Sequence, residues 1–199
     1  MPMVEVPEPA VDQDLVIAAR LGDPAARETL GARASRDAYV FALQLTGDRD
    51  SARDLAQDAV LRFFRRLDSF DESRRIEPWL FQIVRNLVRD RARRRVHRRH
   101  VPLDEHLDDV DGRVPTHQPG PDPLLAVERT LLQERIWSAV RQLSDDHREI
   151  FVLRDHHQLS YREIATILSI PEGTVMSRLH AARKRLRSLL ADDVDGTSP

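Results

Sequence analysis

The stretch LSYREIATILSIPEGTVMSRLHAARKRLRSLL, Leu159–Leu190, contains two helical patterns separated by the break SIPEG. Ser160 and Glu163 have the spacing of a capping box, in which each side chain accepts a hydrogen bond from the other's backbone N–H, and they predict the start of the first helix. Its buried face is expected to consist of Tyr161, Ile164, Ala165 and Leu168. The second helix is predicted to begin at Pro171 and to bury Val175, Leu179, Ala182 and Leu186. Two short helices joined by a tight turn that contains glycine predict a helix-turn-helix.

The side of the second helix opposite its buried stripe is polar and basic. It carries Ser177, His180, Ala181, Lys184 and Ser188, with Arg178 and Arg185 along one flank and Arg183 and Arg187 along the other. A helix in the major groove needs short polar side chains for the base edges and cations for the two phosphate walls. The pattern therefore predicts binding of duplex DNA. The alternative is a solvated basic helix that packs in a bundle.

Composition favours two small helical domains. The chain has 199 residues, enough for one ordinary domain or two small ones. Charged residues make up 32% of it and aromatic residues 5%, which indicates small cores and an ionic surface. The absence of cysteine excludes disulfides, thiolate metal sites and direct thiol redox sensing. With no signal peptide and no long apolar run, we expect a soluble, cytoplasmic protein without direct membrane insertion.

An acidic, proline-rich segment divides the chain. Residues 101–123 contain six acids against one arginine and have no helical period, so they are expected to form an extended acidic linker. Helical patterns precede and follow it, without strand-like alternation. The predicted fold class is all-α, with two small helical domains at residues 12–100 and 124–190.

Two further helices are predicted before this segment. One begins with Asp50 as N-cap, and its apolar face is Ala52, Leu55, Ala56, Ala59, Phe63 and Leu67. The next has Pro78 as its first residue and buries Leu80, Ile83, Val84 and Leu87. Its opposite face carries Trp79, Gln82, Asn86, Arg89, Asp90 and Arg93. Trp79 either packs under the preceding loop or, with the amides and arginines, offers a surface to an unpaired base.

Four motifs, in this order and spacing, resemble the sigma-70 family of bacterial RNA polymerase sigma factors, specifically the extracytoplasmic-function (ECF) group. They are GDPAARETL at 22–30, ARDLAQDAVLRFFRRL at 52–67, EPWLFQIVRNLVRDRARRR at 77–95 and the C-terminal LSDDHREIFVLRDHHQ with the stretch quoted first. The resemblance covers residues 12–190. It implies an alternative sigma factor that binds core RNA polymerase and directs promoter-specific transcription initiation, without enzymatic activity or cofactor.

The resemblance also implies partners and site residues. The partners are the clamp helices of the large β′ subunit, the flap of β, promoter DNA and an anti-sigma factor. Polymerase binding would involve Asp54, Leu55, Gln57 and Asp58. The melted minus-ten element would be met by Trp79, Arg85, Asn86, Arg89 and Asp90. The minus-thirty-five duplex would be met by Ser177, Arg178, His180, Ala181, Arg183 and Lys184.

Some residues depart from the family pattern. Met176 and Ala181 stand where relatives often carry basic residues, so base preferences do not transfer. Asp90 would repel a phosphate unless Arg89 or Arg93 pairs with it.

The resemblance implies that the acidic linker runs towards the polymerase active site. The alternative is that the linker is a plain spacer.

Two other classes of protein are alternatives to a sigma factor. A stand-alone helix-turn-helix regulator would bind its operator without polymerase, but it would leave the basic, tryptophan-bearing helix of the first half unexplained. An enzyme, such as a nuclease or metal-dependent hydrolase, is suggested only by eight histidines. His156 and His157 are adjacent and therefore diverge on a helix, and the sequence contains no H-E-x-x-H, P-loop or nucleophile motif.

Overall fold

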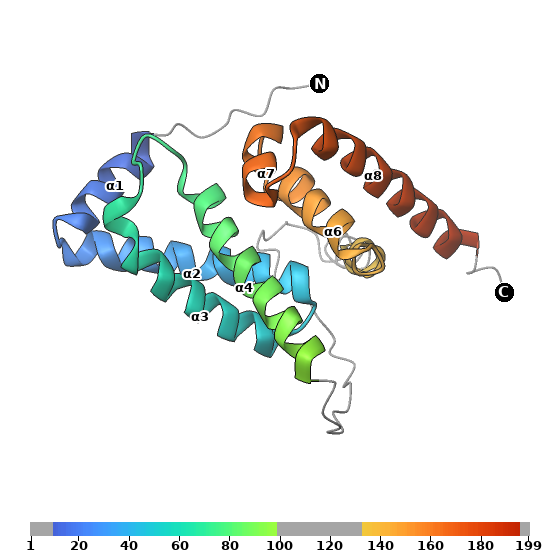
Figure 1. The fold of residues 1–199 in the computed structure, drawn as a ribbon, viewed down its shortest axis with the longest axis horizontal. Coiled ribbons are helices and arrows are strands. Elements are labelled where there is room, and N and C mark those ends of the chain that lie inside the picture. Colours follow the sequence, from blue (N-terminus) through green and yellow to red (C-terminus); the bar gives the residue numbers. More distant parts are fainter. Residues whose placement is uncertain (1–9, 99–132, 196–199) are drawn as a thin grey trace, which may run out of the picture. The chain divides into compact units, whose positions relative to one another are not determined.

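The computed structural model describes residues 10–98 and 133–195, and within these ranges all the regular elements are helices (Figure 1). The chain divides into two compact units, Met1–Asp108 and Asp109–Pro199. The predicted linker at 101–123 lies outside the described residues. The exact domain limits of 12–100 and 124–190 therefore stay a prediction, while the all-α class holds for the described ranges.

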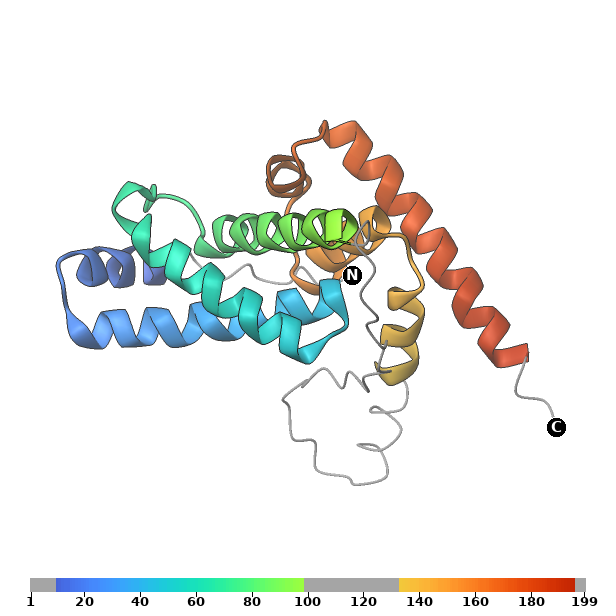
Figure 2. The ribbon, with the colours of Figure 1, turned by 60° about the horizontal axis from the view of Figure 1, so that its bottom comes forward.

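The first unit is built on three long helices. Its elements are α1 (Ala10–Arg20), α2 (Pro24–Thr46), α3 (Arg49–Arg65), the short 3-10 turn η1 (Leu67–Ser69) and α4 (Ile76–Arg98). The helices α2, α3 and α4 pack against one another, and α1 packs on α2 (Figures 1 and 2). The apolar stripes predicted for α3 and α4 are buried, and Phe41 and Phe81 join them with ring centroids 4.6 Å apart.

Helix starts in this unit differ slightly from the predictions. Asp48, not Asp50, is the N-cap of α3, because its carboxylate accepts hydrogen bonds from the backbone N–H groups of Asp50 and Ser51. Helix α4 begins at Ile76, two residues before Pro78. Proline is tolerated there because N–H groups in the first turn have no partner within the helix.

The second unit contains the helix-turn-helix. Helical residues 133–141 are followed by α6 (Asp145–Phe151), the π-helical turn η2 (Val152–His156), α7 (Tyr161–Leu168) and α8 (Glu172–Asp195). Both α6 and α7 pack against α8. The capping box is confirmed, because Ser160 Oγ accepts from Glu163 N at 3.2 Å and the Glu163 carboxylate accepts from Ser160 N at 2.7 Å.

The buried faces of this unit agree with the pattern except in α7. All four residues predicted for the second helix are buried, and that helix begins one residue after Pro171. In α7, Ile167 is buried, whereas Tyr161 and Ala165 are only half-buried. Ile164, Ile167 and Leu168 centre the buried face, which leaves Tyr161 and Ala165 on its flank.

The two glycines in and after α2 provide a stability prediction. Gly31 lies inside the helix, and a Cβ added there would meet Phe64 at 3.5 Å, an ordinary van der Waals distance. Gly31→Ala is therefore expected to raise the free energy of unfolding by about 0.5–1 kcal/mol, because alanine loses less backbone entropy in a helix. Urea denaturation of the purified protein would measure this change.

Gly47 is the matched control for that substitution. It ends α2 with a φ of 70°, in the left-handed region that alanine adopts at a cost of about 1 kcal/mol or more. Gly47→Ala should therefore lower the free energy of unfolding. A change of the same sign in the free energy of unfolding of both variants would contradict this explanation.

Candidate nucleic-acid interface

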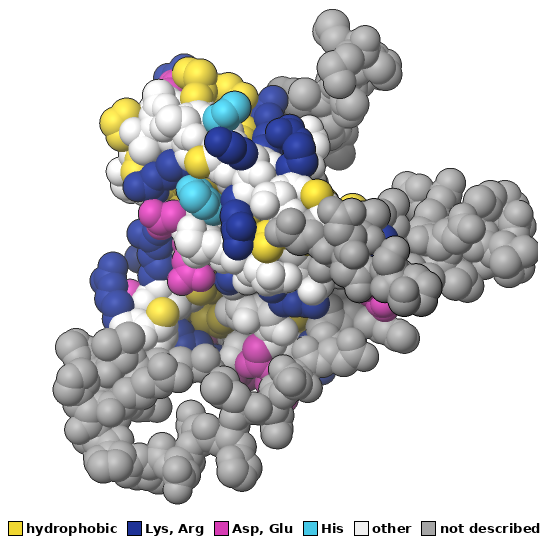
Figure 3. Space-filling view, turned by 90° about the vertical axis from the view of Figure 1, so that its right-hand side faces the viewer, with side chains coloured by type: hydrophobic (Ala, Val, Ile, Leu, Met, Phe, Trp, Pro, Cys, Tyr) yellow, Lys and Arg dark blue, Asp and Glu magenta, His cyan; other side chains and the backbone are white. Residues whose placement is uncertain are grey.

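The outer side of α8 is open to solvent. Ser177, His180, Lys184 and Ser188 are exposed and Ala181 is half-buried, as the sequence pattern predicted. Met176 is 51% exposed on the second turn of the helix. Figure 3 views the side of the molecule that carries α8, and Lys and Arg side chains gather there with histidines among them. The surface therefore has the mixture of small polar, apolar and cationic groups that base edges and phosphates require.

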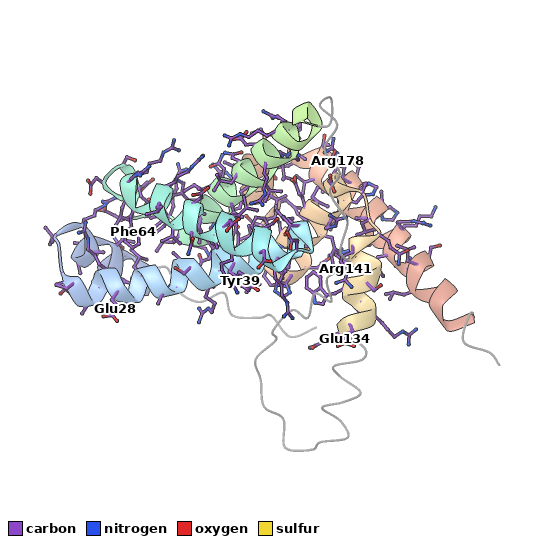
Figure 4. The ribbon with its side chains drawn as sticks, turned by 90° about the horizontal axis from the view of Figure 1, so that it is seen from below. Glu28, Tyr39, Phe64, Glu134, Arg141 and Arg178 are labelled. Atoms are coloured by element: carbon purple, nitrogen blue, oxygen red, sulfur yellow. The ribbon has the colours of Figure 1, made fainter. Side chains whose placement is uncertain are left out.

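The arginines of α8 fall into two groups. Arg178, labelled in Figure 4, forms an ion pair with Asp146 at 2.9 Å. Arg183 holds Asp155 with two parallel hydrogen bonds, of which the Nε–Oδ2 bond is 3.0 Å long. That hydrogen bonding raises the pKa of Arg183, which stays fully charged. No carboxylate of the described residues pairs with Lys184, Arg185 or Arg187 in this way.

Helix α4 presents part of the predicted minus-ten surface. Asn86 is exposed, and Arg89 and Asp90 are half-buried. Arg93 Nη1 lies 3.9 Å from Asp90 Oδ1, which offsets the acid that the sequence placed on this face. Arg85, however, is only 5% exposed and does not lie on this surface. It follows Phe81 by one turn, and the buried side of α4 is wide enough to include both.

Trp79 packs under the loop before α4. Its ring stacks on Phe70 of that loop, with centroids 4.7 Å apart and planes 25° apart, and lies 5.0 Å from Phe63 of α3. Of the two interpretations drawn from sequence, the structure shows the packing contact. Contact with an unpaired base stays a prediction for the part of the half-buried ring that remains accessible.

The exposed face of α3 differs from the prediction in two residues. Asp54, Gln57 and Asp58 are exposed, but Leu55 is 3% exposed and belongs to the hydrophobic core. Leu61, which the sequence reasoning missed, is 56% exposed on the same face. Its spacing could have identified it: Leu61 follows Asp54 by seven residues and Asp58 by three, so the three residues share one face of the helix. An apolar side chain beside two carboxylates and an amide suits a protein partner with basic and apolar groups.

Metal-binding and membrane-spanning features are absent from the described residues. The described residues hold no cluster of three or more His, Asp or Glu side chains arranged for a metal ion. None of the described helices is long and apolar enough to cross a membrane. His156 is exposed and its ring contacts Trp137 edge-on, with centroids 5.5 Å apart.

His157 makes the second unit sensitive to acid. Burial, and then the charge of His156, lower the pKa of His157 to about 3. The unfolded chain takes up this proton near pH 6.5 and the folded chain does not, so stability is complete above about pH 6.5 and falls as the pH drops towards 3. The loss should stay below about 1.4 kcal/mol per pH unit. Melting temperatures at pH 7.5 and 5.5 would measure it.

The control for this effect is His157→Gln, which cannot titrate. Its melting temperature should fall less between pH 7.5 and 5.5 than that of the unchanged protein. An identical fall in both proteins would show that His157 is not the responsible group.

The geometry defines a class of protein: an all-helical protein of two units, with a basic helix-turn-helix of the DNA-binding type in the second unit. Residues 32–98 match the family model for Sigma-70 region 2, and residues 133–186 match the one for Sigma-70, region 4. These two segments are the ones that carry α4 and α8.

Similar curated proteins are described as ECF RNA polymerase sigma factors. The chain is 34% identical over 157 residues to the ECF RNA polymerase sigma factor SigW of Bacillus subtilis, covering 77% of this chain and 83% of the relative. It is 34% identical over 181 residues to the ECF sigma factor SigL of Mycobacterium tuberculosis, covering 87% and 97%. The chain belongs to the ECF group of sigma-70 RNA polymerase sigma factors. It is thus a transcription initiation factor that works with core RNA polymerase at promoters.

Solved structures of two relatives share the fold. One is the sigma factor RpoE from Bartonella quintana, in complex with the anti-sigma factor NepR, with a TM-score of 0.62 and 28% identity over 85% of this chain and 97% of that one. The other is CnrH in complex with the cytosolic domain of CnrY, with a TM-score of 0.63 and 25% identity over 92% and 99%.

Proposed function

We propose that this sigma factor uses three separate helix faces. The exposed face of α3 binds core polymerase, α4 meets the melted minus-ten strand, and α8 reads the minus-thirty-five duplex. One observation carries the proposal: in each helix, polar and charged side chains gather on the face opposite the buried stripe. Residues 12–100 and 124–190 are the corresponding domains, with 101–123 as the linker.

The polymerase contact is assigned to Asp54, Gln57, Asp58 and Leu61. The two carboxylates and the amide attract basic groups of the β′ clamp helices, and Leu61 supplies an apolar anchor that is exposed only in the free protein. Asp54 also lies 3.4 Å from Arg91 of α4. An exposed pair of this kind contributes about 0–1 kcal/mol, so a partner's cation can displace it.

The minus-ten contact is assigned to Asn86 and Arg89, with Asp90 and the edge of Trp79 beside them. Stacking of a flipped base on an aromatic surface returns about 1–3 kcal/mol. Each base-pair step that is opened costs about 1.4 kcal/mol. Capture of one or two bases therefore balances only a small opening, and the rest of the melting must come from the polymerase.

The minus-thirty-five contact is assigned to Ser177, His180 and Ala181 for base edges, and to Lys184 for phosphate. Each good bidentate base contact gives about 1–3 kcal/mol of discrimination, and few such contacts fit on one short helix. Promoter selection therefore depends on both units being held at a fixed separation by core polymerase.

The free chain is accordingly expected to bind promoter DNA weakly and with strong salt dependence. Fluorescence anisotropy with a labelled promoter fragment, over a series of salt concentrations, would measure this. The matched comparison is the same fragment with both promoter elements scrambled. Tight binding that distinguishes the two fragments without core polymerase would favour a stand-alone regulator.

Run-off transcription tests the function itself. Purified core polymerase is incubated with genomic DNA fragments, with and without this protein, and the transcript starts are mapped. New starts that share two spaced upstream elements are expected. The absence of new starts, together with no binding to core polymerase, would contradict the proposal.

The proposal extends to a regulatory partner and to the place in the cell where the protein acts. One relative is bound to an anti-sigma factor in its solved structure, and another is bound to the cytosolic domain of CnrY. We infer that an anti-sigma factor also binds this chain and covers its polymerase-binding face. The protein acts in the cytoplasm, where polymerase and promoter DNA are. It carries out no chemistry of its own and needs no cofactor.

A further inference from the structure

Two ion pairs hold α8 from opposite flanks. On one flank, Arg178 binds Asp146 of the first turn of α6 at 2.9 Å. On the other, Arg183 binds Asp155 of η2 through its Nε and Nη2 groups. Arg183 follows Arg178 by five positions along the helix, which places the two arginines on opposite sides of the buried stripe at about 100° per residue. The helix-turn-helix is thus tied to the rest of its unit on both sides.

The backbone around Asp155 is unusual and firmly held. In the π-helical turn η2, the N–H of His157 donates to the carbonyl of Val152 at 3.0 Å. The next residue, Gln158, has a φ of 57°, and its side-chain Nε2 donates to the carbonyl of Asp155 at 2.8 Å. Turns of this type are rare and are frequently found at functional sites. Here the chain fixes the place from which the Asp155 carboxylate reaches α8.

The ion pairs change what the two arginines can do. A guanidinium that donates two parallel hydrogen bonds to a carboxylate has its charge balanced and its planar fork occupied. Arg183 is in this state, and Arg178 is partly so. Lys184, Arg185 and Arg187 are exposed and have no such carboxylate partner among the described residues, so they are the better phosphate ligands.

We propose that Asp155 and Asp146 are positioning residues that set the rotation of α8 about its axis, and that Arg178 and Arg183 tie the helix to its unit instead of binding DNA phosphates. This inference rests on the proposed role of α8 in reading the minus-thirty-five duplex. It revises the direct DNA contacts that the resemblance implied for Arg178 and Arg183.

Rotation matters because base contacts are short. Side-chain ends lie about 5–6 Å from a helix axis, so a rotation of about 20° moves them by about 2 Å. A hydrogen bond to a base edge tolerates only a few tenths of an ångström. The buried stripe fixes the approximate orientation of α8, and the two flanking pairs restrict the remaining rotation of Ser177 and His180 relative to the groove.

The test uses the full chain assembled with core polymerase, on a promoter mapped by run-off transcription. Binding to the intact promoter is compared with binding to a fragment whose minus-thirty-five element is scrambled, for the unchanged protein, Asp155→Asn, Arg183→Gln and the double variant. We expect each of the three variants to lose about twofold to fivefold of the preference for the intact element. The losses should not add, because both residues act through one pair.

Two further readouts separate positioning from a general loss of stability. A randomised minus-thirty-five element should show altered base preferences in Asp155→Asn, and the conservative Asp155→Glu should restore the original ones. The salt dependence of binding should be unchanged in Asp155→Asn and Arg183→Gln. In contrast, Lys184→Gln should weaken binding to all sequences. It should also reduce the steepness of the plot of log K against log salt concentration, called here the salt slope, by about one.

The opposite results would overturn the proposal. If Arg183 contacts a phosphate, Arg183→Gln lowers the salt slope by about one, and Asp155→Asn leaves binding unchanged or tightens it. If Asp155→Asn does not fold, Asp146→Asn and Arg178→Gln apply the same test on the other flank. If the unchanged protein shows no preference for the intact element, α8 does not read the duplex and both proposals fall. If that preference is present and the aspartate variants keep it, only the positioning role falls.

Discussion

Replacing Leu61 with glutamate is expected to weaken binding to core polymerase by about thirtyfold or more, with little change in the free energy of unfolding. Leu61 is 56% exposed, so the substitution leaves the hydrophobic core intact. In the complex, however, it would bury a third carboxylate beside Asp54 and Asp58 without a matching cation. Loss of an apolar anchor at the centre of an interface costs about 2 kcal/mol or more, which corresponds to this factor. Titration of labelled protein with core polymerase would measure the affinity.

Leu21→Glu is the control for this variant. Leu21 is 84% exposed in the same unit, in the turn between α1 and α2, and the chemical change is identical. It should bind core polymerase as the unchanged protein does. Equal losses for the two variants would mean that α3 does not form the contact, or that any added charge on this unit has the same effect.

Replacing Trp79 with alanine is expected to lower the free energy of unfolding of the first unit by about 2–3 kcal/mol. The substitution removes the stacking on Phe70 at 4.7 Å and the contact with Phe63 at 5.0 Å. A fully buried tryptophan would cost about 3–5 kcal/mol, and Trp79 is only half-buried. Hydrogen exchange followed by mass spectrometry would locate the change, because peptides from α2 to α4 should exchange faster while those from α6 to α8 do not.

Trp79→Leu separates the structural role from a role in DNA opening. Leucine keeps part of the apolar contact with Phe70 and Phe63, so this variant should be more stable than Trp79→Ala, but it has no aromatic face on which a base can stack. Normal promoter opening by Trp79→Leu would assign Trp79 to packing alone. Unchanged stability of Trp79→Ala, with loss of promoter opening, would instead show that the ring binds a base and contributes little to the fold.

The sequence alone was sufficient for features that depend on short-range order. The all-α class, the helix-turn-helix and its capping box follow from spacings of three and four residues, and a helix of fixed period converts such spacings directly into faces. The buried stripes of α3, α4 and α8 were predicted for the same reason. The outward position of Ser177, His180 and Lys184 is simply the complement of one of these stripes.

Only the tertiary structure decided which charged and aromatic side chains are free. Arg85 is buried because neighbouring helices cover more of α4 than its apolar stripe indicates, and Leu61 is exposed although its type favours the core. Trp79 packs on a loop residue nine positions away. Arg183 is paired with Asp155, 28 positions away. Asp155 lies in a π-helical turn that no spacing in the sequence predicts. Periodicity assigns a residue to a face of its own helix, but its partners come from other elements, whose placement depends on how the whole unit packs.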